Sequence, residues 1–517
     1  MPITPTYPGV YIEEIPRGVR TITGVATSIT AFVGRAARGP VSEPTTINSF
    51  ADFERMFGGL VPTCPMSYAV RDFYLNGGNQ AIIVRLASGA QPATLSLPTG
   101  AQAPNDALPL VAANGGAWGN NLNATVDYKT KDATDQNLFN LTISETGGPT
   151  EKFLNVSIND ADARYVPHVL RDGSLLVRVK KDQQGNWIVP NVRPTAVTTA
   201  ATPGSGSDGV ALTDNDYLGN QANKTGIFAL EKADLFNLLC IPPDTRAGDT
   251  SAAVYQAAMA YCYTRRAMLI VDPPTVWGAV KEMAAAAAVA GLNALGLTGD
   301  PSRNAALYFP RVIESDPKQD SQSDIFVPCG IVAGVMASTD TARGVWKAPA
   351  GLEAALNGIM GLQVNLTDAE NGELNPIGIN CLRDFKILGR VVWGSRTLRG
   401  ADQFADDYKY VPVRRLALYI EESLYRGTKW VVFEPNDEPL WAQIRLNVGA
   451  FMQNLFRQGA FQGKTPQETY FVKCDKESTT QNDINLGIVN IIVGFAPLKP
   501  AEFVIIQIQQ MAGQIAT

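Results

Sequence analysis

The sequence contains almost no histidine and no cysteine motif, and both shortages limit the chemistry that it can support. Its one histidine is His168, and its six cysteines are scattered without a CxxC pair. Histidine most often moves protons near neutral pH, and closely spaced cysteines are typical of zinc and redox sites. The cysteines stand in apolar segments such as AYCYT and LLCIP, which indicates small buried side chains in a reducing compartment. We therefore expect no metal, no disulfide and no cofactor.

Charge is scarce as well. Only 18% of the residues are charged, against an ordinary fraction of about 25%. The net charge is −6, and no run of Lys or Arg is long enough to follow a phosphate backbone, so nucleic-acid binding is not expected. A surface with few charges suits a protein that buries much of its exterior against copies of itself.

Long apolar runs and targeting signals are also missing. The longest mostly apolar stretch, Met283 to Leu297, is shorter than the roughly 20 residues of a membrane span. The opening MPITPTYPGV has neither the basic region nor the apolar region of a secretory signal. We expect no membrane span and a protein that folds in a cytoplasm.

Signatures of catalysis are absent too. The sequence has no GxSxG, HExxH or EF-hand pattern. His168 lies between Pro167 and an apolar pair, where a surface or loop position is favoured over a general base. Asp272 in VDPP follows a predicted parallel strand, where α/β enzymes place acids. The two prolines after it favour a turn that opens a helix, with Asp272 near the positive end of that helix.

Two further motifs have a structural and a functional interpretation. GRAARGP at 34–40 looks like a phosphate loop but lacks the GK[ST] that would supply a lysine and a hydroxyl, so a tight turn after a buried strand is favoured. The carboxylates of DAENGELN, Asp368, Glu370 and Glu373, have the residue types of a cation site. A solvated turn is favoured there.

The composition changes along the chain and predicts its organisation. We expect an α/β and α+β multidomain protein: an N-terminal arm over 1–22, a discontinuous α/β core over 23–90 and 216–376, an all-β insertion within 91–215, an α+β C-terminal domain over 377–499 and a C-terminal arm over 500–517. The core is predicted from apolar strands that alternate with helices, including a helix in SFADFERMFGG capped by Ser49. The insertion is predicted from short strand-like segments, such as NLFNLTISE, that turns separate. Residues 88–116 are expected to be linker.

Both ends of the chain carry an isolated strand signal. VYIEEI near the start has no neighbouring hairpin partner, and EFVIIQIQQ near the end has apolar residues on both faces. A lone apolar strand is an aggregation hazard unless another sheet receives it. Strand addition to a neighbouring subunit would satisfy it. The residues predicted to form these intersubunit strands are Val10, Tyr11, Ile12, Ile15, Phe503, Val504, Ile505, Ile506 and Ile508.

Several blocks of the sequence resemble one family. YPGVYIEEIPRG, GVATSITAFVGRAARGP and FYLNGGNQAIIVRL resemble the opening of contractile phage tail sheath proteins. GGAWGNNL is similar to the segment that leads into their insertion domain. STDTARGVWKAPAG, LNPIGINCLRDFKILGRVVWGSRTL, YVPVRRLALYIEESLYRGTKWVVFEPNDEPLW and GIVNIIVGFAPLKPAEFVIIQI resemble their later blocks. The resemblance covers both ends and most of the middle, but little of 120–215.

The resemblance implies a structural subunit and not an enzyme. It implies hexameric rings stacked around an inner tail tube, a metastable extended state, and contraction that drives the tube through a target envelope. The implied partners are further copies of the chain, the tube protein, and the baseplate and tail terminator proteins. The implied location is a virion tail or phage-tail-like particle, assembled in the cytoplasm of a bacterial host.

The same resemblance places the C-terminal domain against the tube. The helix expected over 438–458 has an apolar stripe of Ile444, Val448, Phe451 and Leu455. Its other side carries Arg445, Gln453 and Arg457, which are predicted to contact the tube. The alternative is that this side is merely solvated.

Two other classes of function remain open. One is a tube- or surface-binding module that uses the β-rich insertion, and the other is a cytoplasmic α/β enzyme. The sequence does not separate a phage from a bacteriocin or a toxin-delivery device, and it does not identify the host or the charge pairs that change on contraction.

Overall fold

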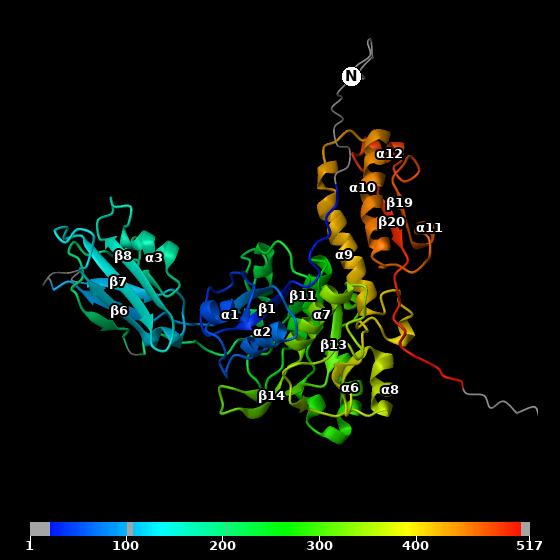
Figure 1. The fold of residues 1–517 in the computed structure, drawn as a ribbon, viewed down its shortest axis with the longest axis horizontal. Helices are drawn as coiled ribbons and strands as arrows, with labels where there is room; N and C mark the ends of the chain where they lie inside the picture. The colour runs from blue at the N-terminus through cyan, green and yellow to red at the C-terminus, as the bar shows by residue number, and fades with distance from the viewer. Residues whose placement is uncertain (1–20, 101–106, 203, 508–517) are drawn as a thin grey trace, which may run out of the picture. The chain divides into compact units, whose positions relative to one another are not determined.

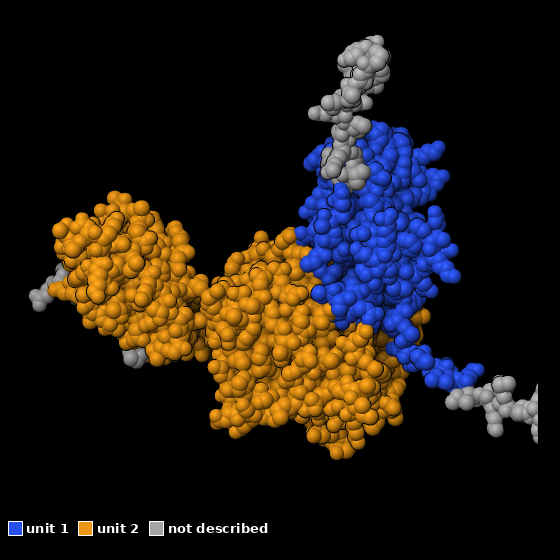
Figure 2. Space-filling model, viewed as in Figure 1, with its two compact units in different colours: residues 1–27, 339–348, 408–517 blue, residues 28–338, 349–407 orange. Residues whose placement is uncertain are grey.

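The computed structural model describes residues 21–100, 107–202 and 204–507. These residues divide into two compact units (Figure 2). Unit 1 combines residues 1–27, 339–348 and 408–517, and unit 2 combines residues 28–338 and 349–407.

Unit 2 contains a central sheet of eight strands, as far as the described residues show (Figure 1). The strand order is β18-β17-β13-β12-β11-β1-β3-β2, and only the outer strands β2 and β18 run antiparallel to their neighbours. The bounds are β1 Thr30–Arg35, β2 Thr45–Ile47, β3 Ala81–Leu86, β11 Leu238–Cys240, β12 Met268–Val271, β13 Ala305–Phe309, β17 Ile379–Phe385 and β18 Gly389–Val392. The parallel strands are buried on both faces, which is why they appear in the sequence as continuous apolar runs.

Helices cover both faces of this sheet and complete an α/β core. On one face, α5 (Ala252–Thr264) and α6 (Ala284–Gly291) share an apolar cluster with β1, β3, β11, β12 and β13. On the other face lie α2 (Pro65–Leu75) and the first turns of α7 (Cys329–Arg343), and Phe73 of α2 meets Phe32 of β1 edge to face. Gly330 permits the close approach of α7, because a Cβ there would lie 2.1 Å from the carbonyl oxygen of Ala69. The α/β core is therefore confirmed.

The first predicted helix shows how local sequence sets these elements. Helix α1 (Phe50–Phe57) begins at Ser49, whose side chain accepts a hydrogen bond from the backbone N–H of Asp52. It ends at Gly58, which adopts a left-handed conformation with φ of 94°. A small sheet of β14 (Val312–Asp316), β15 (Gln322–Phe326) and β16 (Gly361–Leu362) completes the core.

The insertion has two antiparallel sheets with one shared apolar core (Figure 1). Strands β4 (Thr94–Pro98), β5 (Ala107–Ala112) and β9 (Val177–Val179) form one sheet, and β10 (Thr198–Ala200), β6 (Leu122–Asp127), β7 (Leu138–Glu145) and β8 (Thr150–Ser157) form the other. Its β-rich character is as expected, but it also contains helix α3 (Val166–Gly173). β4 and β5 fall where a linker was expected.

The chain enters and leaves the insertion through adjacent segments. Ser88 pairs with Val210 and Gln91 pairs with Ser207 in antiparallel bridges. The following helix α4 (Asp214–Leu218) contributes Tyr217 to the core cluster. The insertion therefore ends near residue 207, earlier than the expected 215.

The described part of unit 1 is an α+β domain around two long helices. Helices α9 (Val411–Gly427) and α10 (Glu438–Arg457) pack in one apolar cluster with strands β19 (Tyr470–Lys473) and β20 (Ile492–Phe495). The shorter helices are α11 (Pro466–Thr469) and α12 (Gln481–Asn485). This domain begins at residue 408 and not at 377, because β17 pairs with β13 of the core sheet and is buried there.

Candidate assembly interface

Helix α10 is the framework of the C-terminal domain. Asp437 caps its first turn by accepting a hydrogen bond from the backbone N–H of Leu440 at 3.2 Å. The stripe of Ile444, Val448, Phe451 and Leu455 is buried, as its spacing predicted. This face holds the small β19–β20 sheet and fixes the position of that sheet in unit 1.

Two of the three side chains predicted to contact the tube are used inside the domain. The hydroxyl of Tyr470 donates to Oε1 of Gln453 at 2.8 Å. Arg445 donates to the backbone carbonyl of Cys474 and pairs with Glu438. The expectation that Arg445 and Gln453 point outward was therefore wrong, since both side chains hold the strand region onto the helix.

The exposed face of α10 is different from the expected one. Arg457 is exposed, as expected. The other exposed residues of the helix middle and end are Ala442, Gln443, Leu446, Ala450 and Asn454. Tube contact through this helix stays a prediction, and it now rests on these residues with Arg457.

The β19–β20 sheet is small, and an isolated antiparallel bridge between Phe461 and Pro497 lies just beyond β20. Its register pairs Tyr470 with Phe495 and Lys473 with Ile492, and among the described residues no third strand joins it. Phe471 and Ile492 are exposed on this sheet. An edge with unpaired backbone groups and exposed apolar side chains is a template for strand addition.

The chain that follows this sheet is apolar and exposed. Phe503, Val504, Ile505 and Ile506 are between 71% and 84% exposed, and no strand pairing includes them. The hydroxyl of Tyr410 donates to Glu502 at 2.9 Å, which holds the chain just before this segment. Their assignment as intersubunit strands stays a prediction. Val10, Tyr11, Ile12, Ile15 and Ile508 lie outside the described residues.

Residues 23–27, expected to begin the core, belong to unit 1, as does Ile22 at the end of the expected arm. The backbone N–H of Val25 donates to the hydroxyl of Ser423 at 3.2 Å, and Ile22 is buried against the α9–α10 cluster. Arg415 of α9 donates to the carbonyl of Thr27 at 2.8 Å and to both oxygens of Asp340. No periodicity or motif in this segment predicts these contacts.

Asp272 is a structural acid at the end of β12. Its Oδ1 accepts the backbone N–H of Cys329 at 2.9 Å, so it lies at the start of α7 and not at a helix opened by Pro273 and Pro274. Burial raises the pKa of Asp272 to about 7, and Oδ2 has no hydrogen-bond partner. Asp272 does lie at the start of a helix, as predicted, but that helix is α7 and not the one expected after Pro274.

His168 is exposed on α3. Its ring meets those of Tyr165 and Trp187 edge to face, at centroid distances of 5.4 and 5.1 Å. The surface position is confirmed, although it lies on a helix.

The other two motifs are structural. After β1, the turn in GRAARGP is held by Arg85, which donates to the carbonyls of Ala36 and Gly39 at 2.9 and 2.8 Å. Glu370 completes a capping box with Thr367 at the start of α8 (Asp368–Leu374), and Asp368 pairs with Arg383 at 2.8 Å. The tight turn is confirmed, and these two carboxylates serve a helix start and an ion pair.

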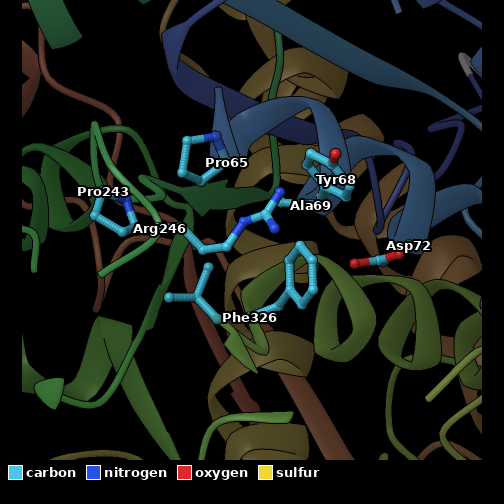
Figure 3. A pocket seen from close by; sticks show the side chains of 8 residues that line it. Pro65, Tyr68, Ala69, Asp72, Pro243, Arg246 and Phe326 are labelled. Atoms are coloured by element: carbon cyan, nitrogen blue, oxygen red, sulfur yellow. The ribbon is translucent and has the colours of Figure 1, made fainter. Parts of the chain in front are cut away.

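A partly buried arginine, Arg246, fills the space between α2 and β15 (Figure 3). The guanidinium of Arg246 lies 4.8 Å from the ring centroid of Tyr68 and 4.5 Å from that of Phe326. It also pairs with Asp316 and Asp324, each at 2.8 Å. The remaining cavity measures about 10 Å³, which is room for no more than one water molecule. These side chains therefore pack against one another and leave no room for a ligand.

Cysteine chemistry is suppressed by burial. All six cysteines are free and buried. Burial raises the pKa of Cys64 and of Cys474 to about 11, which keeps both as unreactive thiols at neutral pH. Within the described ranges, no three His, Cys, Asp or Glu side chains are grouped so that they could hold a metal ion. The expected absence of a cofactor remains a prediction.

Comparison with known proteins finds similarity to tail sheath proteins. The model of the phage tail sheath C-terminal domain matches residues 405–511, which is nearly the C-terminal part of unit 1. The tail sheath protein of Vibrio phage KVP40 is 29% identical over 174 residues, 34% of this chain and 24% of that protein. These matches make the chain similar to tail sheath proteins, above all in its C-terminal part.

Solved sheath structures share the fold over almost the whole length of this chain. The helical sheath of the anti-feeding prophage in its contracted state covers 98% of this chain and 100% of its own, at 24% identity and a TM-score of 0.57. A sheath tail protein from Listeria innocua covers 92% of this chain and 96% of its own, at 15% identity and a TM-score of 0.60. The curated phage relative is matched over only about a quarter of its length. None of the described helices is both long and apolar enough to cross a membrane.

Proposed function

We propose that the chain is the structural subunit of a contractile sheath, which polymerises as stacked hexameric rings around an inner tube. The observation that carries this proposal is the exposed apolar segment Phe503–Ile506, which follows a two-stranded sheet that no third described strand joins. A donor strand and a receiving edge on every copy allow each copy to be both donor and acceptor. Such a contact repeats without limit and produces a polymer.

The donor segment supplies enough free energy to hold neighbouring copies together. Each backbone hydrogen bond added to β19 or β20 contributes about 0.5 to 1.5 kcal/mol. Burial of each large apolar side chain adds roughly 1.5 to 3 kcal/mol before the cost of ordering the segment is subtracted. Several of these hydrogen bonds and buried side chains at each contact between copies keep the copies linked while the subunits rotate.

The proposed mechanism needs no reaction at the sheath itself. The extended sheath is metastable, and contraction moves subunits into a better-packed lattice while the terminal strands keep neighbours linked. The free energy is stored when the sheath assembles, and a small gain per subunit adds up over many copies. The tube is then driven through the target envelope. The inner tube, the baseplate and the tail terminator are the partners, and assembly takes place in the bacterial cytoplasm.

Electron microscopy of the purified chain tests this function. A sheath subunit gives rings or long tubules, alone or when mixed with its tube protein. A tube- or surface-binding module, or an enzyme, elutes from size-exclusion chromatography as a small discrete species. A chain that stays monomeric at all concentrations, with and without tube, would refute the proposal.

A further inference from the structure

The turn of the β17–β18 hairpin carries an exposed apolar knob. Ile387 is 96% exposed and Leu388 is 56% exposed, next to the exposed Lys386. The stem below the turn is firm, because the rings of Phe385 and Trp393 meet edge to face with centroids 4.8 Å apart. Isolated exposed apolar residues are common on protein surfaces. This one matters because of what lies at the other end of the same hairpin.

That other end has an apolar cavity of about 230 Å³. An engineered cavity of about 150 Å³ accepts benzene, so this one has room for a branched aliphatic side chain. The segment from Met283 to Thr298, which provides one wall, contains no charged residue. The apolar lining consists of Val289, Leu292, Leu297, Ile377, Leu398 and Phe404.

The knob and the cavity lie at opposite edges of one sheet. β17 runs parallel to β13, so the turn at Ile387 lies at the carboxyl edge. The chain returns along β18 to the amino edge, where the backbone N–H of Leu398 donates to the carbonyl of Ala305 at the start of β13, at 2.8 Å. Ile387 therefore cannot reach the cavity of its own subunit. It can reach the cavity of a second copy.

Charge favours the same pairing. Lys386 is exposed at the knob. Asp300, with a side chain 65% exposed, follows the cavity residue Gly299, and its contact with Arg303 is long, at 3.8 Å. Arg303 instead pairs more closely with Asp406, at 2.9 Å. Asp300 beside the cavity of one copy is therefore an accessible ion-pair partner for Lys386 beside Ile387 of another copy.

We propose that the β17–β18 turn of one copy inserts Ile387 into the cavity at the opposite end of the same hairpin in a neighbouring copy. This inference rests on the proposed function and names a second contact between copies, distinct from the terminal strands. The two surfaces differ, so the contact is head-to-tail and continues into a ring or a helix.

Cross-linking tests the geometry directly. We expect an Ile387→Cys, Phe404→Cys variant to form a ladder of disulfide-linked multimers after mild oxidation of assembled tubules. The six natural cysteines are buried and contribute no background. A control variant with Ile387→Cys and Leu154→Cys, the latter on exposed β8 of the insertion, should give no ladder.

Assembly measurements test the energetics. Ile387→Asp should raise the concentration needed for assembly by at least about tenfold, the effect of losing one buried aliphatic side chain. Leu154→Asp is the matched control and should leave that concentration unchanged. Lys386→Glu should weaken assembly, and adding Asp300→Lys in the same chain should restore it. Circular dichroism should show native helix content in every variant, because all four positions are exposed.

The outcomes separate this inference from the proposed function. If the wild-type chain forms neither rings nor tubules, the sheath proposal itself fails. If wild-type tubules form but Ile387→Asp assembles equally well, or if oxidation yields no ladder, the knob-and-cavity contact is refuted and the sheath remains. A linked dimer without higher multimers would also refute it, since a head-to-tail contact must propagate.

Discussion

Arg415 and Asp340 form a two-pronged ion pair, with N–O distances of 2.9 and 2.6 Å, whose side chains are only 3% and 4% exposed. The same guanidinium donates to the carbonyl of Thr27. One arginine of α9 thus holds the last turns of α7 and the start of the described chain. Burial raises the pKa of Asp340, and Arg415 opposes that effect by favouring the carboxylate.

Removing Arg415 should destabilise unit 1 strongly. Arg415→Met leaves a buried carboxylate without its partner, which costs about 3 to 5 kcal/mol. A urea titration followed by circular dichroism should show an earlier transition. The double variant Arg415→Met, Asp340→Leu should recover most of the loss, because no buried charge remains. Equal destabilisation in the single and double variants would contradict this account.

Asp272 should make stability depend on pH. Its pKa in the folded chain is about 7, raised by burial from the ordinary value of 3.8. The folded state therefore holds a proton that the unfolded state releases between these two values. The contribution of Asp272 to the free energy of unfolding is fully present below about pH 4 and is lost as the pH rises to about 7.

Asp272→Asn provides the measurement of that dependence. Between about pH 4 and 7, the free energy of unfolding of the variant should change less than that of the wild type. The difference should be roughly 1.4 kcal/mol for each unit by which the pKa of Asp272 is raised. Thermal melts at several pH values compare the two proteins. Parallel stability curves for wild type and variant would show that the carboxyl is already ionised in the folded chain.

Removing the exposed C-terminal segment should abolish assembly and leave the fold intact. Deletion from Phe503 onward keeps Glu502 and its hydrogen bond with Tyr410. The truncated chain should stay soluble and monomeric with unchanged helix content, yet form no tubules. Circular dichroism and electron microscopy measure both properties. Unfolded or insoluble protein would show that the segment belongs to the core of its own subunit.

Lengthening the N-terminal arm should have a different effect. Two or three residues inserted near Gly18 leave the strand residues in place and add slack between them and the core. We expect sheaths that assemble but resist contraction, because neighbours are coupled less tightly. Contraction triggered by mild denaturant and followed by electron microscopy tests this. Loss of assembly would place Gly18 itself inside a contact.

The insertion should be dispensable for polymerisation. Residues 92–206 can be replaced by a linker of about four residues, because antiparallel neighbours need only a short turn. Arg38 would lose its ion pair with Glu145 in this variant, so Arg38→Gln should accompany the replacement. Tubules with a smaller outer diameter are expected in electron micrographs. A folded variant that forms none would give the insertion a role in assembly.

The two faces of α10 should respond differently to substitution. Arg445→Ala removes hydrogen bonds of a charged group to Cys474 and Glu438, which should cost about 1 to 3 kcal/mol of stability. Arg457→Ala should leave stability unchanged and weaken binding to the tube. Thermal melts and co-sedimentation with tubes distinguish these effects. If a double variant with Arg457→Ala and Leu446→Asp binds the tube as well as the wild type does, α10 does not contact the tube.

The sequence predicted those helices and strands that depend on residues close together in the chain. The Ser49 cap, the apolar stripe of α10 and the buried parallel strands all follow from the identity and spacing of neighbouring residues. Strands β4 and β5 were missed because proline and alanine dominate their surroundings, although Leu95, Leu97, Leu108, Leu110 and Ala112 alternate as strand residues do.

What the sequence could not predict depends on contacts between distant segments. The hairpin of β17 and β18 was assigned to the C-terminal domain because nothing in it signals pairing with β13, some 70 residues earlier. The same holds for Arg445, whose partner at Cys474 is reached only after the chain folds back. An amphipathic pattern gives the buried face of a helix, but it does not show which polar residues a neighbouring strand covers.

The adjacent entry and exit of the insertion have a mechanical consequence. Ser88 and Val210 pair directly, as do Gln91 and Ser207. A force pulling the two ends of the chain apart passes across these bonded pairs and bypasses the residues between them. The insertion is thus a side branch that bears no tension while the sheath works. Its length and sequence are free to diverge, and foreign domains grafted at this point would travel with the sheath without weakening it.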